Sequence, residues 1–167
     1  NKMIDYHIGL ISVWDSSGRY ARQKQDPYGI GELRYPKLGQ SENSKQRFIT
    51  RSQNASAVLA STLKLGVIPY AQGGPEVEEV FSPLAAALSK TKVSDPNEGF
   101  FRDEAQLVIV IITDADDSTS RDPENPAMTL TYEQMAQKLF DFKKGRKEKV
   151  SVYAALVKPS DSDEFKD

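Results

Sequence analysis

The chain has 167 residues, 38% of them hydrophobic and 28% charged, a composition that is ordinary for a single globular domain. Its 22 basic and 24 acidic residues give a formal net charge of -2, which provides no broad attraction for nucleic acid or an acidic membrane surface. The lack of cysteine excludes disulfides and thiolate metal sites, and the single histidine, His7, excludes most zinc sites and Ser-His-Asp arrangements.

No stretch approaches the roughly 20 apolar residues that span a bilayer, so no membrane span is expected in this chain. The sequence begins with Asn1 rather than methionine and shows no signal peptide, which favours a fragment or a processed form.

The first predicted strand covers residues 6–14, YHIGLISVW, which are apolar on both faces. His7 within it is expected to be a hydrogen-bonded structural residue. Residues 15–53 are polar and predict an elaborated loop with an edge hairpin, in which 31–35 and 47–50 resemble short strands. Tyr20, Tyr28 and Tyr35 in this loop either form a protein-recognition surface or simply order the loop.

Two helices are predicted next. Asn54 can cap a helix over residues 55–65, a sufficient reason for an asparagine that also belongs to a glycosylation sequon. A second helical spacing follows Gly73-Gly74-Pro75-Glu76 and runs over 77–88. Pro83 either kinks this helix, or a new helix starts there with Ser82 as its cap.

Residues 107–120, LVIVIITDADDSTS, are the most informative stretch of the chain. The uncharged, mostly β-branched run 107–113 predicts a strand buried on both faces of a parallel sheet, although a short buried helix is the competing interpretation. Asp114, Asp116 and Asp117 follow at the carboxyl end of this strand, where such sheets bind ligands.

The C-terminal part predicts another helix and strand. Thr131-Tyr132-Glu133-Gln134 fits a capping box that begins a helix, and the basic run 143–149 is expected to face solvent at its end. Residues 150–157 predict a further buried strand, and the tail 160–167 is too polar to pack. Strands alternating with helices predict a doubly wound, mostly parallel α/β sheet with helices on both faces.

Four phrases resemble, in order, the second strand, third-helix region, fourth strand and fifth strand of a von Willebrand factor type A domain: DYHIGLISVW, the Gly-Gly turn before EVEEVFSPLAAAL, GFFRDEAQLVIVIITDADD and KVSVYAALV. The likeness, closest to the bacterial exported members, covers roughly residues 4–158 and implies one domain over 1–159. It also implies a periplasmic, cell-surface or secreted location.

The resemblance implies a metal-ion-dependent adhesion site that holds Mg²⁺ or Mn²⁺. Asp114 matches the family's aspartate after the fourth strand, Asp116 and Asp117 are candidate ligands beside it, and Glu76 could approach from the neighbouring loop. Where the family has a threonine, this chain has Gln72-Gly73-Gly74. Alternatively, the acidic residues only cap the following segment and keep the end of the strand polar.

No segment before Tyr6 can hold the family's first strand with its Asp-x-Ser-x-Ser motif. That strand lies between the second and fourth in the family's sheet, so 7–14 and 107–113 would face each other across a gap with unpaired backbone groups. We therefore expect the first strand to lie outside this sequence, or to be supplied by another chain.

The first functional hypothesis is a non-enzymatic module that binds protein partners within a larger complex, with a divalent cation near Asp114. The second is a scaffold subunit whose metal site is degenerate, which Gln72-Gly73-Gly74 favours. The third, less favoured, is a metal-assisted hydrolase that uses Asp114 and Asp116, although the chain has no phosphate-binding glycine loop and no evident nucleophile-base pair.

Overall fold

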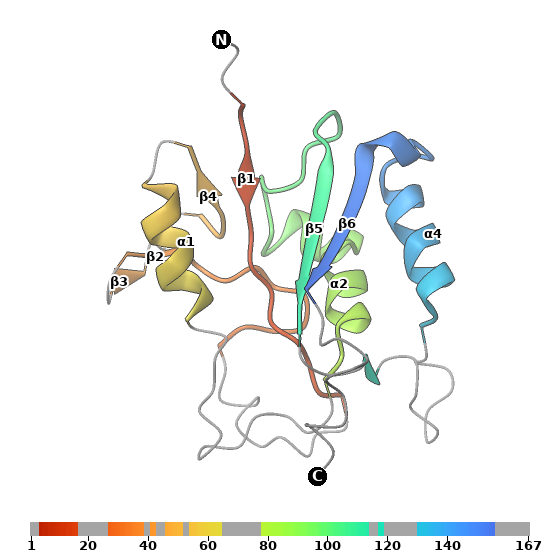
Figure 1. Ribbon diagram of the computed structural model, residues 1–167, viewed down its shortest axis with the longest axis horizontal. Helices are drawn as coiled ribbons and strands as arrows, with labels where there is room; N and C mark the ends of the chain where they lie inside the picture. Colours follow the sequence, from red (N-terminus) through yellow and green to blue (C-terminus); the bar gives the residue numbers. More distant parts are fainter. Residues whose placement is uncertain are drawn as a thin grey trace.

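The protein has mixed α/β structure, as the computed structural model shows (Figure 1). The structure describes residues 4–16, 27–38, 41–42, 46–51, 54–64, 78–113, 117–118 and 130–155. Their strands form three two-stranded sheets, one parallel and two antiparallel. The predicted mixture of helices and strands is therefore confirmed, but these residues do not form the one continuous doubly wound sheet that the sequence predicted. The predicted tail 160–167 lies outside them.

The C-terminal part of the chain is a β-α-β unit. Strands β5 (Leu107–Ile112) and β6 (Val150–Ala155) pair in parallel, each residue of one strand opposite one residue of the other. Helix α4 (Tyr132–Phe142) connects them in sequence and lies beside β6 in Figure 1. Strand, helix and strand therefore occur where the sequence predicted them.

Local signals explain where α4 begins and ends. The Thr131 side chain accepts a hydrogen bond from the Gln134 N–H, and the Gln134 side chain accepts one from the Thr131 N–H, which confirms the capping box. Lys144 and Gly145 have positive φ after the last turn, and a 3-10 turn, η5 (Lys147–Lys149), leads into β6.

The predicted first strand is extended but pairs over only part of its length. Strand β1 (His7–Ile8) is antiparallel to β4 (Ile49–Thr50), which lies within the predicted 47–50 strand. A hairpin is present in the predicted loop, but it consists of β2 (Lys37–Leu38) against β3 (Ser41–Glu42) and not of the strand-like runs 31–35 and 47–50. Further along the first segment, Trp14 forms an isolated antiparallel bridge with Glu79.

Of the remaining helices, α1 (Ala55–Leu63) begins where it was predicted, whereas the helix predicted over 77–88 begins later, at Phe81. Helix α1 follows Asn54, whose side chain makes no capping hydrogen bond, so the predicted reason for this asparagine is wrong. Helix α2 (Phe81–Ala87) places Pro83 in its first turn, where no intrahelical donor is lost. It is therefore one helix without an internal break, and a short helix α3 (Lys90–Ser94) follows it.

His7 has a structural role, as predicted. Its ring stacks on Phe48 with centroids 4.3 Å apart, and its Nδ1 donates to the Phe100 carbonyl oxygen at 3.0 Å. Ile49 beside it is fully buried. This aromatic cluster joins β1 and β4 to the segment that precedes β5.

Residues 27–36 are irregular, yet several of them are buried. Asn97, which is 0% exposed, accepts from the Leu33 N–H and donates to the Gly31 carbonyl, both at 2.9 Å. Gly31 has a φ of 71°, and a Cβ there would lie 2.4 Å from the Ala87 backbone nitrogen of α2. Tyr28, which is 8% exposed, accepts from the Tyr35 N–H at 3.1 Å and so helps to order this loop.

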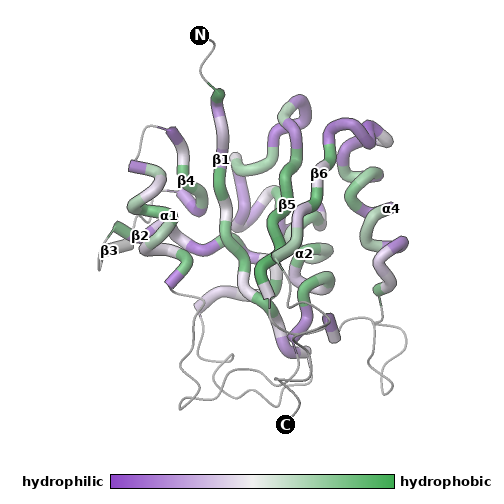
Figure 2. The backbone as a smooth tube through the Cα atoms, in the orientation of Figure 1, coloured by the Kyte–Doolittle hydropathy of each residue, from purple (hydrophilic) through white to green (hydrophobic). Residues whose placement is uncertain are grey.

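The prediction that residues 107–113 and 150–157 form buried strands is wrong for most of their described positions. Burial alternates along β5, where the odd-numbered residues are half-buried and the even-numbered ones are exposed, and β6 is exposed from Val152 onward. In Figure 1, α2 lies behind the two strands, and no described helix covers their other face. Apolar residues continue along β5 nonetheless (Figure 2).

Candidate functional site

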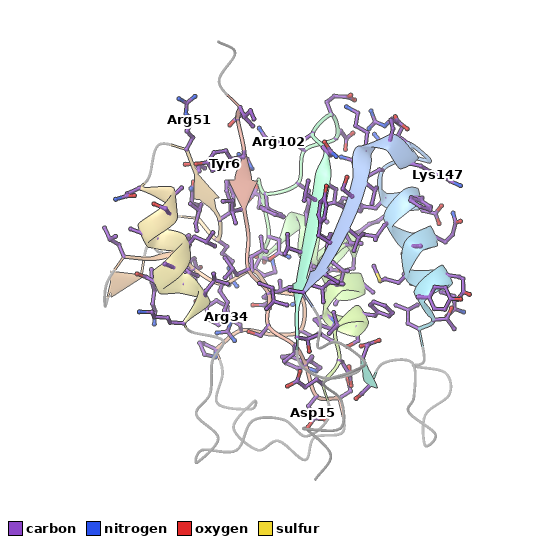
Figure 3. The ribbon with its side chains drawn as sticks, viewed as in Figure 1. Tyr6, Asp15, Arg34, Arg51, Arg102 and Lys147 are labelled. Atoms are coloured by element: carbon purple, nitrogen blue, oxygen red, sulfur yellow. The ribbon has the colours of Figure 1, made fainter. Side chains whose placement is uncertain are left out.

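Polar side chains gather at the carboxyl end of β5. The Trp14 N–H donates to the Glu79 carbonyl at 3.0 Å, and the Glu79 N–H donates back to the Trp14 carbonyl at 2.8 Å. This bridge brings Asp15 and Ser16 to the segment before α2, at the lower end of the molecule in Figure 3. We call the group of residues that meets here the carboxyl-end cluster: Asp15, Ser16, Glu78, Glu79, Ser82, Thr113, Asp117 and Ser118.

Glu79 is held in one orientation by the donors around it. Its Oε1 accepts from the Ser16 N–H at 2.8 Å, and its Oε2 accepts from the Ser16 hydroxyl at 2.9 Å and from the Ser82 hydroxyl. The residue is 7% exposed, and Asp15 next to it is 2% exposed. Burial of carboxylates this deep requires such hydrogen bonds.

Asp117 caps helix α2. Its Oδ1 accepts from the Val80 N–H at 2.7 Å and from the Phe81 N–H at 3.3 Å, at the positive end of the helix dipole. Ser82 was the cap in one of the two predicted alternatives, but these N–H groups are bound by the Asp117 carboxylate from a distant segment. At the same end of the sheet, the Thr113 hydroxyl donates to Glu78 Oε2 at 3.1 Å.

Most of the predicted ligand residues lie outside the described residues: Asp114, Asp116, Gly73, Gly74 and Glu76. Among the described residues, no group of three Asp, Glu, His or Cys side chains is arranged to hold a metal ion. Asp117 and Glu79 already accept several hydrogen bonds from within the protein. The described part of the cluster therefore does not fit a cation by itself, and an ion near Asp117 would need ligands from the undescribed residues.

The carboxyl-end cluster could be predicted only in part. Asp117 was predicted from the pattern of a strand followed by acidic residues, whereas Asp15 and Ser16 were only part of the predicted loop 15–53. Glu79 was missed because it fell inside the helical spacing predicted over 77–88, and Ser82 was considered only as a possible helix cap. In the structure Glu79 precedes α2 and pairs with Trp14.

A second candidate site is the uncovered face of the β5–β6 pair. Val108 is 53% exposed, Val110 62%, Ile112 66% and Tyr153 62%, and these side chains share one face because opposed residues of a parallel pair point the same way. We call these four residues the open sheet face. Five of the nine exposed large hydrophobic side chains in the described part of the chain lie on β5 or β6. Apolar exposure is thus concentrated here.

A groove runs between β5 and the extended segment before Trp14. It encloses about 100 Å³ and is lined without a charged side chain by residues 11–13, 109–112, Val80, Pro83 and Leu84. Residues 11–13 and β5 face each other across this groove, and among the described residues β5 pairs with β6 alone. Residues from both of the apolar segments that were predicted to face each other thus line this groove.

The basic run 143–149 does not simply face solvent as predicted. Lys143 is 3% exposed, and its Nζ donates to the Arg102 and Asp103 carbonyls at 3.0 and 2.9 Å. Burial lowers the pKa of this ammonium group. Arg146 pairs with both carboxylate oxygens of Glu104 at 2.9 Å. These hydrogen bonds and this ion pair connect the end of α4 to the turn before β5, so the basic run has a structural role.

Comparisons of the chain with protein-family models, with curated proteins and with solved structures gave no match. Within the residues that the structure describes, no helix is both long and apolar enough to cross a membrane. The two candidate sites are therefore the features that bear on function.

Proposed function

We propose that this protein is a non-enzymatic module that binds another protein through the open sheet face and so takes part in a larger assembly. One observation carries the proposal: Val108, Val110, Ile112 and Tyr153 stand exposed on a strand pair of the parallel type. Parallel sheets are normally covered on both faces. Contiguous exposed apolar residues of this kind mark interaction surfaces.

The energetics favour a partner over solvent. Burying one large apolar side chain contributes about 1.5–3 kcal/mol, so covering the four residues of the open sheet face contributes several kcal/mol before the cost of association is subtracted. The rigid β5–β6 pairing adds to this, because a preformed face loses little conformational entropy on binding.

We also propose that the chain has the fold of von Willebrand factor type A domains, which it resembles in sequence. This resemblance implies a location outside the cytoplasm. What supports this fold is the β5-α4-β6 unit, with its parallel strands and connecting helix, and the polar cluster at the carboxyl end of β5. A doubly wound sheet with helices on both faces would result if a further strand and helix joined this unit.

Photo-crosslinking in the cells that make the protein tests the binding function. A photoreactive amino acid is placed at Val110 or at Tyr153, and as a matched control at Tyr132, an exposed aromatic residue of α4 away from the face. We expect positions 110 and 153 to yield the same adduct, identified by mass spectrometry and reproduced with the purified partner, and position 132 not to yield it. No adduct at 110 and 153, or equal adducts at all three positions, would contradict the proposal.

A cation-dependent form of the same function is the second candidate, since the carboxyl-end cluster brings Asp15, Glu79 and Asp117 to the end of the strand that leads into Asp114. Calorimetric titration with Mg²⁺ and Mn²⁺ tests it. The cation form predicts heat that Asp114→Ala abolishes and that Asp141→Ala, at an exposed acid of α4, leaves unchanged. If the unchanged protein gives no heat, the cation form is excluded. The scaffold form, in which the open sheet face acts without a metal, then remains.

A further inference from the structure

The open sheet face fits a second copy of itself in shape and in composition. We infer that two copies of this chain associate through this face, sheet against sheet, about a twofold axis that runs along β5 and β6. The inference rests on the proposed protein-binding function and specifies the partner, which is a further molecule of the same chain. A twofold contact of this kind is the commonest form of association between identical chains.

The sizes of the opposed side chains suit this axis. Three rows of the strand pair share the face: Val108 and Ser151, Val110 and Tyr153, Ile112 and Ala155. Each row joins a larger side chain to a smaller one. A twofold axis between the strands exchanges their sides, so β5 of one copy lies over β6 of the other and each larger side chain meets the partner's smaller one. Side chains of two stacked sheets interdigitate in this way when the sheets pack about 10 Å apart.

The three rows contain no charged side chain. A charge close to a twofold axis lies near its own copy and is repelled by it, so an uncharged face accepts a second copy better than a charged face does. A different protein is usually oriented by charges of opposite sign, and these residues offer none. Contacts between identical chains are also more apolar than contacts between different chains. The composition of the face therefore favours a second copy as the partner.

The face is large enough for the centre of a dimer interface. Its four residues are each more than half exposed, which corresponds to roughly 400–500 Å² of surface. A standard interface buries about 800 Å² on each partner, with an apolar centre and a polar rim. The rim begins on this face at Gln106, whose Nε2 donates to the Ser151 hydroxyl at 2.8 Å. From this area we expect a dimer with a dissociation constant in the micromolar range.

Analytical ultracentrifugation of the full chain over a wide range of concentrations measures this association. We expect an equilibrium between one chain and two. Val110→Lys places a charge at the centre of the face twice in each dimer, so the dissociation constant should rise by about a hundredfold or more. Tyr132→Lys is the matched control, because it introduces the same charge at an exposed position of α4, and it should change the dissociation constant by less than about twofold.

A mixture of two variants tests the contact between β5 of one copy and β6 of the other. Val110→Lys and Tyr153→Glu each bring like charges together in their own dimers. In a mixed dimer the introduced lysine faces the introduced glutamate, so the mixture should associate at least about tenfold more tightly than either variant alone. Circular dichroism checks that both variants fold. Should Val110→Lys not fold, Tyr153→Ala, which removes the largest side chain of the face without adding charge, is expected to weaken association by about tenfold or more.

The outcomes separate this inference from the proposed function. A single chain at every concentration, assembly beyond two chains, association that is undiminished in the folded variants, or a mixture that associates no better than its parts overturns the twofold dimer. If crosslinks at positions 110 and 153 then join a different protein, the proposed function stands without it. If the dimer depends on Val110 as expected and the crosslinks join two copies of this chain, both the inference and the proposed function are supported.

Discussion

Regular strands are usually buried and irregular loops are usually exposed. Here the loop 27–38 holds buried side chains, whereas the β5–β6 pair exposes apolar ones. Residues 27–36 of this loop form no helix or strand, yet Tyr28, Leu33 and the Asn97 side chain that holds the loop are all buried. The strand pair is the most regular part of the sheet structure, yet Val110 and Ile112 are more than 60% exposed. Under the proposed function, the exposed valine and isoleucine side chains form the surface that a partner would cover.

The largest expected effect is in the loop region. Asn97→Ala leaves the buried Leu33 N–H and Gly31 carbonyl without their partner, and we expect the free energy of unfolding to fall by about 3 kcal/mol. Urea unfolding measures it, with Glu98→Ala, an exposed neighbour, as the control that should change stability by less than about 0.5 kcal/mol. Similar values for both variants would mean that Asn97 does not hold the loop.

A smaller effect in the same region depends on pH. Burial of Glu32 raises the pKa of its carboxyl, but the Lys92 ammonium at 2.6 Å and the Arg47 guanidinium at 3.0 Å outweigh burial, and the net pKa lies below its usual 4.5. The ionised form therefore stabilises the fold above that pH, and this contribution is lost as the pH falls through the lowered pKa.

Glu32→Gln is accordingly expected to unfold more easily by about 1 kcal/mol at pH 7. The difference from the unchanged protein should narrow steadily below pH 4.5, the ordinary pKa of this carboxyl. Denaturant titrations at several pH values measure it. A difference that stays constant down to pH 3, or one that grows there, would show that the ion pairs around Glu32 do not contribute in the assigned way.

The smallest effect on stability is expected on the open sheet face. Ile112→Thr and Val108→Thr keep β-branched side chains on exposed positions, so each should change the free energy of unfolding by less than about 0.5 kcal/mol. Ile109→Thr, at a half-buried position on the other face of β5, is the matched control and should cost more than about 1 kcal/mol. Equal costs at 108 and 109 would contradict the assignment of an open and a covered face.

The sequence predicted the positions of helices and strands better than it predicted which of their faces are buried. The run 107–113 and the capping box at Thr131 are local signals, and both elements formed where these signals placed them. Burial on both faces of β5 could not be predicted locally, because it depends on which segments cover the strand in space. The carboxyl-end cluster depended in the same way on the pairing of Trp14 with Glu79, two residues far apart in the chain.

The central claim is that β5 has one paired edge and one open edge, and amide hydrogen exchange resolved by residue tests it most directly. In the free protein we expect slow exchange at Ile109, Ile111 and Thr113, whose N–H groups face β6, and fast exchange at Val108, Val110 and Ile112. Equal protection of all six amides in the free protein would contradict the account.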